Sequence, residues 1–394
     1  MRQPVGCVVR GQQVSGICAS DRRARDFQTS CIRAPGSGQG FTLVELMVAL
    51  VIGSLIAVAA ASLSFSFDAS RRATLASNNA TSGGAAAVSS LAAQLSMAGA
   101  GLISNGVQYC QTLYATNPGG DQQIDPLLID HASNPNSDLL QFAFASGGNA
   151  AAMLPIPAAL ATLTSDIPVS SVGAVNAQDQ VLLAFDIGGL SACVLRRATS
   201  LTPPASGVPG PPGPTVLHFG ADPLNGPLGN AGVPLSYGVG SYVVPVGGLT
   251  MQRWYAENGV LRQKDMLAGT VQDVADGVLY LRAQFGIDSG TGTAWTDIAP
   301  AQPSLTGAQL AALRSVRVAL LARTTDREKQ ADPTKCTTTT NPVIALGNAW
   351  GLTVDVSALT NTSGTALVPD WQCYSYRTYS TVQPLRNVIW GAPA

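Results

Sequence analysis

Hydrophobic side chains dominate one segment near the start of the chain. Residues 46–63, which read LMVALVIGSLIAVAAASL, contain no charged side chain. As a helix, this segment is almost long enough to cross the hydrocarbon core of a bilayer. Glu45 directly precedes it, and a charged side chain in a bilayer core costs on the order of 3 kcal/mol. An acid at such a position predicts a functional partner for its carboxylate.

A helical pattern continues beyond the apolar segment. No proline occurs between Phe41 and Ala98, which predicts one helix about 80 Å long. Its second half is amphipathic, because small or apolar residues recur at every third or fourth position. These are Ala80, Gly84, Ala87, Val88, Leu91, Leu95 and Ala98. We expect a kink or break at Gly83-Gly84 and an end at Gly99, Gly101 and Asn105-Gly106.

From residue 100 onward the pattern changes to short β-strands separated by turns. The hairpin signal is clearest at Glu257-Asn258-Gly259, which joins the last two predicted strands. The predicted strands are Leu139–Ala145, Gln180–Asp186, Cys193–Ala198, Thr215–Phe219, Ser241–Val246, Leu249–Tyr255 and Val260–Lys264. Residues 146–179 and 199–214 are predicted to be long loops, the second ending in a stiff PGPPGP connector.

The last third of the chain predicts further elements. Thr306 and Gln309 have the spacing of a capping box, which predicts the start of a short helix. The segment SVRVALLAR at 315–323 predicts a strand. Aromatic residues gather near the C-terminus, and their alternation with polar residues favours a half-buried strand over a ligand platform. They are Trp371, Tyr374, Tyr376, Tyr379 and Trp390.

Composition and charge exclude two broad classes. With 46% hydrophobic and 11% charged residues, the chain is too apolar to be disordered. Its net charge is −1 and its body has no basic cluster, so a nucleic-acid partner is not expected. Six arginines and two aspartates precede residue 41, which gives that segment a net charge of +4. A basic flank before one apolar span predicts a cytoplasmic N-terminus, with the remainder across the membrane.

The cysteines also divide at the apolar span. Three of the seven precede it, and four follow it: Cys110, Cys193, Cys336 and Cys373. An even number in an exported domain predicts two disulfides, with three possible pairings. Our preferred pairing is Cys336 with Cys373 and Cys110 with Cys193, and four separate buried thiols are the alternative.

Signs of catalysis or metal binding are scarce. The two histidines, His131 and His218, belong to no catalytic motif and receive no predicted role. The stretch from Asp288 to Asp297 contains oxygen ligands, but glycines occupy two positions where a calcium loop carries carboxylates. A glycine-rich hairpin turn is therefore preferred there. We predict no enzyme activity, no cofactor and no metal site.

Three interpretations of residues 1–67 compete. One is a secretory signal peptide with Ala57-Val58-Ala59 as the cleavage site, and another is a plain membrane anchor. The third is favoured, because GFTLVELMVALVIGSLI resembles the signal of type IV pilins and type II secretion pseudopilins. The resemblance implies that a prepilin peptidase cuts after Gly40 and that Phe41 becomes N-methylated. It also implies that Glu45 pairs with the N-terminal amine of an adjacent subunit. The 40 residues before the cut exceed the family's usual leader.

The C-terminal third is similar to the minor pilins of the PilW type. The matching pieces are Asp276-Gly277-Val278, Gly286-Ile287-Asp288, Val316-Arg317 and Leu385-Arg386-Asn387. The resemblance implies a pilin-like α+β fold, with a long N-terminal helix followed by a large antiparallel β-rich domain. The expected parts are a leader (1–40), a membrane-spanning half-helix (41–67), an amphipathic half-helix (68–99) and a periplasmic domain (100–394).

The function implied by this resemblance is that of a minor pilin in a type IV pilus. Such a subunit sits in the inner membrane as a single-pass protein before it enters the fibre, where it primes assembly or lies at the tip. Expected partners are prepilin peptidase, other minor and major pilins, the inner-membrane assembly platform and the membrane. Two alternatives remain: a type II secretion pseudopilin of the J type, and a pilus-tip adhesin that binds a surface or glycan.

Overall fold

The computed structural model describes fourteen parts of the chain and leaves the others out. They are residues 42–104, 107–108, 112–117, 120–124, 127–131, 136–145, 153–157, 166–169, 175–184, 192–202, 215–227, 241–297, 312–327 and 336–386. Within these parts, side chains are described for all residues except those in 62–82, 103–112, 117–126 and 182–192. The chain divides into two compact units, Met1–Leu63 and Ser64–Ala394.

One α-helix begins the described chain, and β-strands follow it. The helix α1 (Leu43–Leu95) is continuous and ends four residues before Gly99, close to the predicted end, and Gly99 and Gly101 adopt positive φ. Its amphipathic stripe is confirmed from Gly84 to Ala98, where the stripe residues are buried or half-buried. The predicted end at Asn105-Gly106 and the side chain of Ala80 lie outside the described residues. The α+β class is thus confirmed.

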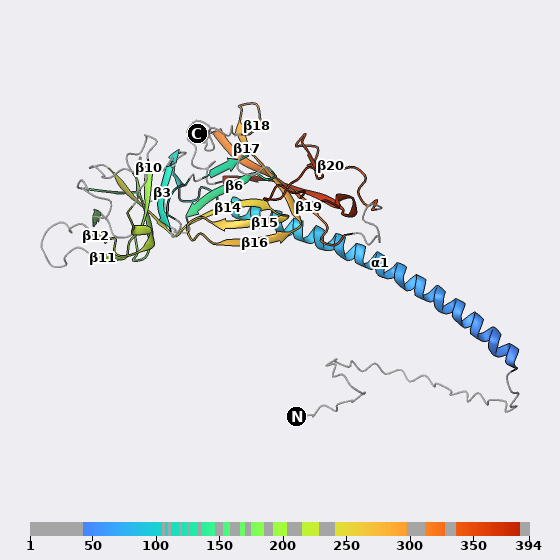
Figure 1. Ribbon diagram of the computed structural model, residues 1–394. Coiled ribbons are helices and arrows are strands. Elements are labelled where there is room, and N and C mark those ends of the chain that lie inside the picture. The colour runs from blue at the N-terminus through green and yellow to red at the C-terminus, as the bar shows by residue number, and fades with distance from the viewer. Residues whose placement is uncertain are drawn as a thin grey trace, which may run out of the picture. The chain divides into compact units, whose positions relative to one another are not determined.

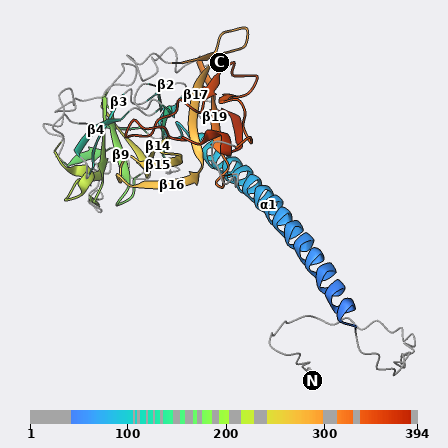
Figure 2. The same ribbon diagram turned by 45° about the vertical axis from the view of Figure 1, so that its right-hand side comes forward.

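Four sheets carry most of the second unit. The first has the order β4-β3-β10-β9-β13-β7, the second β11-β12-β8, the third β16-β15-β14-β6-β5 and the fourth β18-β17-β19-β22. Most pairs are antiparallel, but β10 and β3 run parallel. Figures 1 and 2 both show β14, β15 and β16 side by side.

The strand bounds are as follows. The first sheet contains β3 (Thr112–Asn117), β4 (Gly120–Ile124), β7 (Leu154–Pro155), β9 (Gln180–Ala184), β10 (Ala192–Arg197) and β13 (Tyr242–Gly247). The second contains β8 (Ile167–Val169), β11 (Ser200–Thr202) and β12 (Thr215–His218). The third contains β5 (Leu127–Asp130), β6 (Leu139–Ala145), β14 (Leu249–Glu257), β15 (Val260–Asp265) and β16 (Val271–Asp276). The fourth contains β17 (Val278–Asp288), β18 (Thr293–Thr296), β19 (Leu313–Arg323) and β22 (Tyr376–Pro384).

Short elements complete the described chain. Two-stranded sheets are formed by β1 (Ile103–Ser104) with β2 (Val107–Gln108) and by β20 (Val343–Ala345) with β21 (Thr353–Asp355). The 3-10 helices are η1 (Pro223–Asn225) and η3 (Trp371–Cys373). Every predicted strand is present, and its ends differ by at most two residues wherever the structure describes them. The predicted strand end at Asp186 and the predicted helix at Thr306 lie outside the described residues. The predicted loop 146–179 contains β7 and β8, and β11 begins the predicted loop 199–214, so these loop assignments are wrong in part.

A shared core joins α1 to the third and fourth sheets. Leu91 and Leu95 of α1 belong to the same buried cluster as Trp254 of β14, Phe285 of β17 and Leu320 of β19. All five side chains are fully buried. At about 25 cal/mol per Å² of buried apolar surface, each such side chain stabilises the fold by roughly 1.5–3 kcal/mol. The amphipathic part of α1 is therefore an integral part of the β-rich unit.

Of the kink or break expected at Gly83-Gly84, the break is wrong, because α1 continues through both glycines. Gly84 serves close packing instead. A Cβ added to Gly84 would lie 2.3 Å from Cε2 of Tyr379 on β22, whereas one added to Gly83 would meet nothing within 4 Å. Glycine lets the tyrosine ring lie directly against the helix backbone.

Alanine substitutions at these two glycines should change the stability of the protein in opposite directions. Gly83→Ala should stabilise the protein by about 1 kcal/mol through helix propensity. Gly84→Ala should destabilise it by about 1–3 kcal/mol, because the added methyl group overpacks the Tyr379 ring. Chemical denaturation of the full chain in detergent measures both. In a Tyr379→Ala background, Gly84→Ala should become stabilising, and a destabilisation that persists there would contradict the assigned contact.

Candidate functional site

The start of α1 places Glu45 in the first helical turn. The Thr42 hydroxyl accepts a hydrogen bond from the Glu45 backbone N–H at 3.3 Å. Thr42 thus acts as the N-cap, and Thr-x-x-Glu is the residue order of a capping box. An acid in the first turn also interacts favourably with the helix dipole. This cap was not predicted from the sequence. Gly40 and Phe41 lie outside the described residues.

Apolar side chains on the first part of α1 have no cover within the described chain. Residues 43–61 have a mean hydropathy of 2.5 and form one helix long and apolar enough to cross a membrane. The exposed large side chains are Leu43, Val44, Leu46, Met47, Val48, Leu50, Val51, Ile52, Leu55, Ile56 and Val58. A single apolar helix of this kind is typical of single-pass membrane anchoring.

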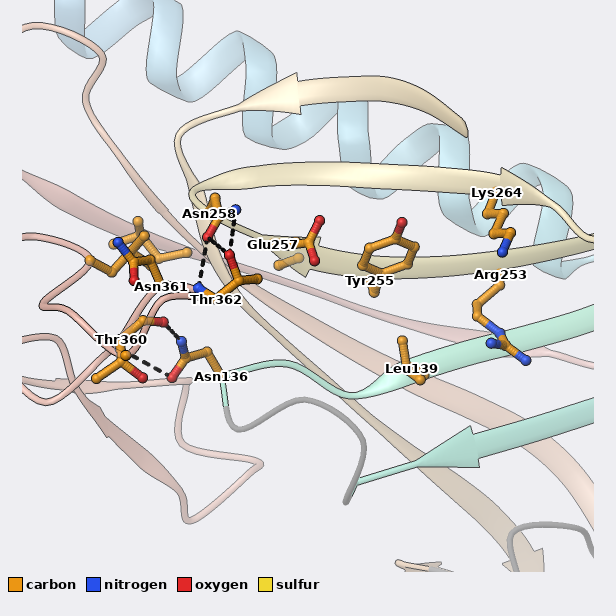
Figure 3. Close-up of a pocket in the computed structure, with 14 residues that line it drawn as sticks. Asn136, Leu139, Arg253, Tyr255, Glu257, Asn258, Lys264, Thr360, Asn361 and Thr362 are labelled. Carbon is orange, nitrogen blue, oxygen red and sulfur yellow. Dashed lines mark hydrogen bonds between the residues drawn. The ribbon is translucent and has the colours of Figure 1, made fainter. Parts of the chain in front are cut away.

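A pocket of about 580 Å³ lies in the second unit, and its polar lining was not predicted (Figure 3). It is formed by the outer face of the third sheet and by the segment 359–367, which we call the pocket loop. The lining residues are Asn136, Leu139, Arg253, Tyr255, Ala256, Glu257, Asn258, Lys264, Leu279, Thr360, Asn361, Thr362, Gly364 and Leu367.

The alternation of side chains along β14 explains which of them face the pocket. Trp254 and Ala256 point into the core and are buried, so Arg253, Tyr255 and Glu257 project from the opposite face. The hairpin turn that joins β14 to β15 has positive φ at both Asn258 and Gly259, as a two-residue turn of this kind requires. This hairpin was predicted from the sequence.

Strand register sets the neighbours of these side chains. Arg253 lies directly opposite Lys264 of β15 and Gln141 of β6, and Tyr255 lies opposite Arg262. Arg253 donates from Nε and Nη2 to Oε1 of Gln141, at 3.0 and 2.7 Å. The two cations of this pocket, Arg253 and Lys264, are therefore cross-strand neighbours.

Two pairs of hydrogen bonds fasten the pocket loop to the rest of the site (Figure 3). Asn136 donates from Nδ2 to the Thr360 carbonyl and accepts from the Thr360 N–H. Asn258 accepts from the Thr362 N–H at 3.1 Å and donates to the Thr362 hydroxyl. Inside the loop, the Asn361 side chain accepts backbone N–H groups at 2.9 and 3.0 Å. The loop is consequently a fixed wall.

The charged and polar side chains on the pocket face of the third sheet differ in whether they have partners. Arg262 forms ion pairs with Glu257 and, at 3.0 Å, with Asp273. Burial, and next the negative charge of Glu257, raise the pKa of Tyr255, so its hydroxyl stays protonated at neutral pH. Within the described part of the chain, the Lys264 ammonium and the Tyr255 hydroxyl make no hydrogen bond or ion pair. Both groups are available to a ligand.

Both histidines lie in polar clusters that tie segments together. Nδ1 of His131 is 2.8 Å from Oδ1 of Asp138, and Nη1 of Arg282 is 2.9 Å from the same ring nitrogen. His218 lies 2.9 Å from Oδ2 of Asp166. These contacts join strands to neighbouring loops. Among the described residues, no three His, Cys, Asp or Glu side chains gather in a way that could hold a metal ion.

The stretch 288–297 forms the glycine-rich hairpin that the sequence favours. Asp288 pairs with Thr293 across β17 and β18, and the Ser289 N–H donates to the Gly292 carbonyl at 2.9 Å. The Asp288 carboxylate accepts from the Gly290 N–H at 2.8 Å. Asp297, at the end of the stretch, instead bonds to Arg282.

Cys336 and Cys373 form a disulfide, which confirms half of the preferred pairing. Cys193 is also disulfide-bonded, and its predicted partner Cys110 lies outside the described residues. Cys336 and Cys373 delimit a segment that packs on the outer face of the fourth sheet, with Val356 in the same buried cluster as Leu321 of β19. That segment includes the whole pocket loop.

The arginine in the sequence VRVAL on β19 has a structural role that the sequence did not reveal. Arg317 lies between two tryptophan rings, with Cζ 4.6 Å from the centroid of Trp295 and 4.4 Å from that of Trp350. Its Nε donates to Gln284 at 2.7 Å and its Nη1 to the Ala349 carbonyl at 2.8 Å. Burial lowers the pKa of Arg317, and the flat guanidinium stacks where a lysine would not.

Packing also explains the residue type at three other positions in the PilW-like pieces. Gly277, in the turn before β17, has φ +81, and a Cβ there would lie 2.8 Å from the Arg323 carbonyl oxygen. Gly286 faces Ser315 and Trp295 so closely that a Cβ would lie within 3 Å of both. Leu385 is fully buried in the core shared with α1. Each of these positions serves packing within the described residues.

Comparisons with known proteins found two family matches and a similar solved structure. Residues 249–387 match the family model of the type IV pilus-assembly protein W, and residues 37–61 match the prokaryotic N-terminal methylation motif. Among solved structures, the chain is similar to a type IV-like pilin from Thermus thermophilus. The identity is 13% over 76% of this chain and 94% of that chain, with a TM-score of 0.28. A search of curated proteins found no match.

The two family matches make this chain similar to type IV pilins in two separate segments. Residues 249–387 are thus similar to the PilW family, and residues 37–61 are similar to the methylation motif. The Asp-Gly-Val, Gly-Ile-Asp, Val-Arg and Leu-Arg-Asn pieces quoted from the sequence all lie within the matched domain.

Proposed function

We propose that this chain is a minor pilin of a type IV pilus, a structural subunit rather than an enzyme, used in priming the fibre or at its tip. The observation that carries the proposal is the methylation motif at 37–61, which overlaps an exposed apolar helix with Glu45 in its first turn. Its expected partners are prepilin peptidase, the inner-membrane assembly platform and other minor and major pilins.

Size supports a minor rather than a major subunit. Removal of the 40-residue leader from the 394-residue chain leaves 354 residues, which is large for a fibre lattice that favours compact heads. The four β-sheets and the disulfide-bounded segment 336–373 account for much of this bulk. A subunit used once or a few times at the end of a fibre does not have to pack within that lattice.

The proposed topology follows from charge and hydropathy. Residues 41–67 span the inner membrane, with the arginine-rich residues 1–40 on the cytoplasmic side and the β-rich domain in the periplasm. Residues 68–99 continue the helix into that domain, where the stripe from Gly84 to Ala98 is packed. Residues 100–394 form the periplasmic part. After extraction from the membrane, the apolar side chains of 43–58 would pack against helices of neighbouring subunits.

Processing gives the direct test of this proposal. Mass spectrometry of the protein purified from membranes should find a mature chain that begins with N-methylated Phe41. Gly40→Leu should leave the precursor uncut, because the peptidase of this family accepts little beyond a small side chain at that position. Gly53→Leu, within the same apolar helix, is the matched control and should be cut normally. A mature chain that begins at Ala60 or Ser62 would show signal-peptidase cleavage and refute the proposal.

A further inference from the structure

The pocket lies where a ligand must be recognised by side chains. β14 has β15 on one side and β6 on the other, and β15 has β14 and β16. The backbone groups of these central strands are therefore used in the sheet, and an extended peptide cannot add to the pocket as another strand. The volume of about 580 Å³ is within the usual range for small-molecule sites.

One end of the pocket favours an anion. Arg253 and Lys264 are directly opposite each other in the β14–β15 register, and like charges so placed repel. The carboxylate that lines the pocket, Glu257, is already the ion-pair partner of Arg262. A ligand carboxylate beside Arg253 and Lys264 would accept a charge-assisted hydrogen bond from the Lys264 ammonium, which makes no hydrogen bond or ion pair within the described part of the chain.

The remainder of the pocket offers an aromatic surface and hydrogen-bonding groups. Tyr255 contributes its ring and, beside the cations, a hydroxyl that makes no hydrogen bond to any described residue, and Leu139 adds apolar surface. Thr360 and Asn361 of the pocket loop line the end of the pocket away from the two cations (Figure 3). An aromatic ring beside amides and hydroxyls suits a sugar ring, which has apolar faces and hydroxyl edges. The hydrogen bonds that fix the pocket loop make this geometry preorganised.

We propose that this pocket binds a carboxylated sugar unit, such as a hexuronic acid, with its carboxylate at Arg253 and Lys264 and its ring against Tyr255. The inference goes beyond the subunit role in a fibre, since it concerns a ligand of the β-rich domain. Its test uses binding alone, so its failure would leave the proposed function untouched.

The experiment compares ligands that carry a carboxylate, a sugar ring or both. The full chain in detergent micelles is titrated with D-glucuronate, D-glucose, acetate and a tetra-aspartate peptide, and binding is followed by saturation-transfer NMR and calorimetry. Glucuronate should bind roughly tenfold more tightly than glucose, because a charge-assisted contact is worth about that factor. Acetate and the peptide should bind much more weakly than glucuronate.

Variants then assign the contacts. Lys264→Gln should weaken glucuronate binding roughly tenfold and leave glucose unaffected. Tyr255→Ala should weaken glucuronate without changing acetate. Arg314→Gln removes a cation that pairs with Asp288 outside the pocket and serves as the matched control, with unchanged affinity. Circular dichroism checks that each variant is folded.

Three outcomes would overturn the proposal. Equal affinity for glucose and glucuronate would remove the role of the carboxylate. Equal affinity for acetate and glucuronate would remove the role of the sugar ring, and tighter binding of the tetra-aspartate peptide would assign the pocket to a peptide. Failure of all four probes to bind at about 50 mM, well above the weak millimolar range, would refute a ligand site of this chemistry.

Discussion

Glu45→Ala is expected to abolish entry of this protein into the fibre while leaving membrane insertion and cleavage intact. The proposed partner of the Glu45 carboxylate is the N-terminal amine of a neighbouring subunit, and alanine offers no counter-charge. Removal of a charge from the apolar helix should, if anything, favour residence in the bilayer by a few kcal/mol. The comparison is between cleaved protein in membranes and protein in sheared pili, or pilus number if the subunit only primes assembly.

The structure separates this effect from loss of the helix. Thr42 caps the helix through the backbone N–H of residue 45, which Glu45→Ala retains. Alanine is also the best helix former, so α1 should begin at the same place. Glu45→Gln should fail as Glu45→Ala does, and Glu45→Asp should be intermediate because it keeps the charge with a shorter reach.

The same assay can refute the role of Glu45 in assembly. Normal incorporation and normal piliation in the Glu45→Ala strain would mean that the carboxylate has another purpose. Thr42→Ala is the matched control, since it removes the cap and keeps the charge. It should cost about 1 kcal/mol of helix stability and leave assembly largely intact. A stronger defect in Thr42→Ala than in Glu45→Ala would assign the defect to the helix start.

Local patterns in the sequence were enough to predict the elements that depend on near neighbours. The β14–β15 hairpin was found because Asn258-Gly259 supplies the two positive φ values that its turn needs. The strand β6 was found with both ends correct, because its hydrophobic run is bounded by polar or small residues. The stripe from Gly84 to Ala98 was visible because helical spacing alone defines it.

Elements without a local hydrophobic signal were missed. β4 reads GDQQI and β16 reads VQDVAD, and neither shows the alternation of a half-buried strand. β7 and β8 have two and three residues, too few to show any period. The parallel pairing of β10 with β3 depends on residues about 80 positions apart, which no local pattern reveals.

The two proposed sites differ in how far the sequence predicts them. Gly40, Phe41 and Glu45 belong to one short motif, so the assembly site could be proposed from six adjacent residues. The pocket depends on Asn136 with Thr360 and Asn258 with Thr362, pairs that are 224 and 104 residues apart. Likewise, the close approach of Tyr379 of β22 to Gly84 could not be seen in the sequence around the glycine. Tertiary contacts decided each of these cases.

Removal of the Cys336–Cys373 disulfide should destabilise one segment of the protein far more than the rest. The bond closes a loop with a sequence separation of 37, worth roughly 3–4 kcal/mol in the chain-entropy model. A double Cys336→Ala, Cys373→Ala variant is preferable to a reductant, because Cys193 is disulfide-bonded too. Amide hydrogen exchange should show a large loss of protection in residues 336–375, with little change in residues 83–95 of α1.

This local effect has a consequence for the pocket. The segment between the two cysteines carries Trp350, which stacks on Arg317, and it also carries Thr360 and Thr362 of the pocket loop. Because the disulfide limits opening of that segment, its loss should weaken glucuronate binding even though no lining residue has changed. A uniform loss of protection across α1 and the β-sheets would show instead that the disulfide stabilises the whole unit and leaves the pocket wall no looser than its surroundings.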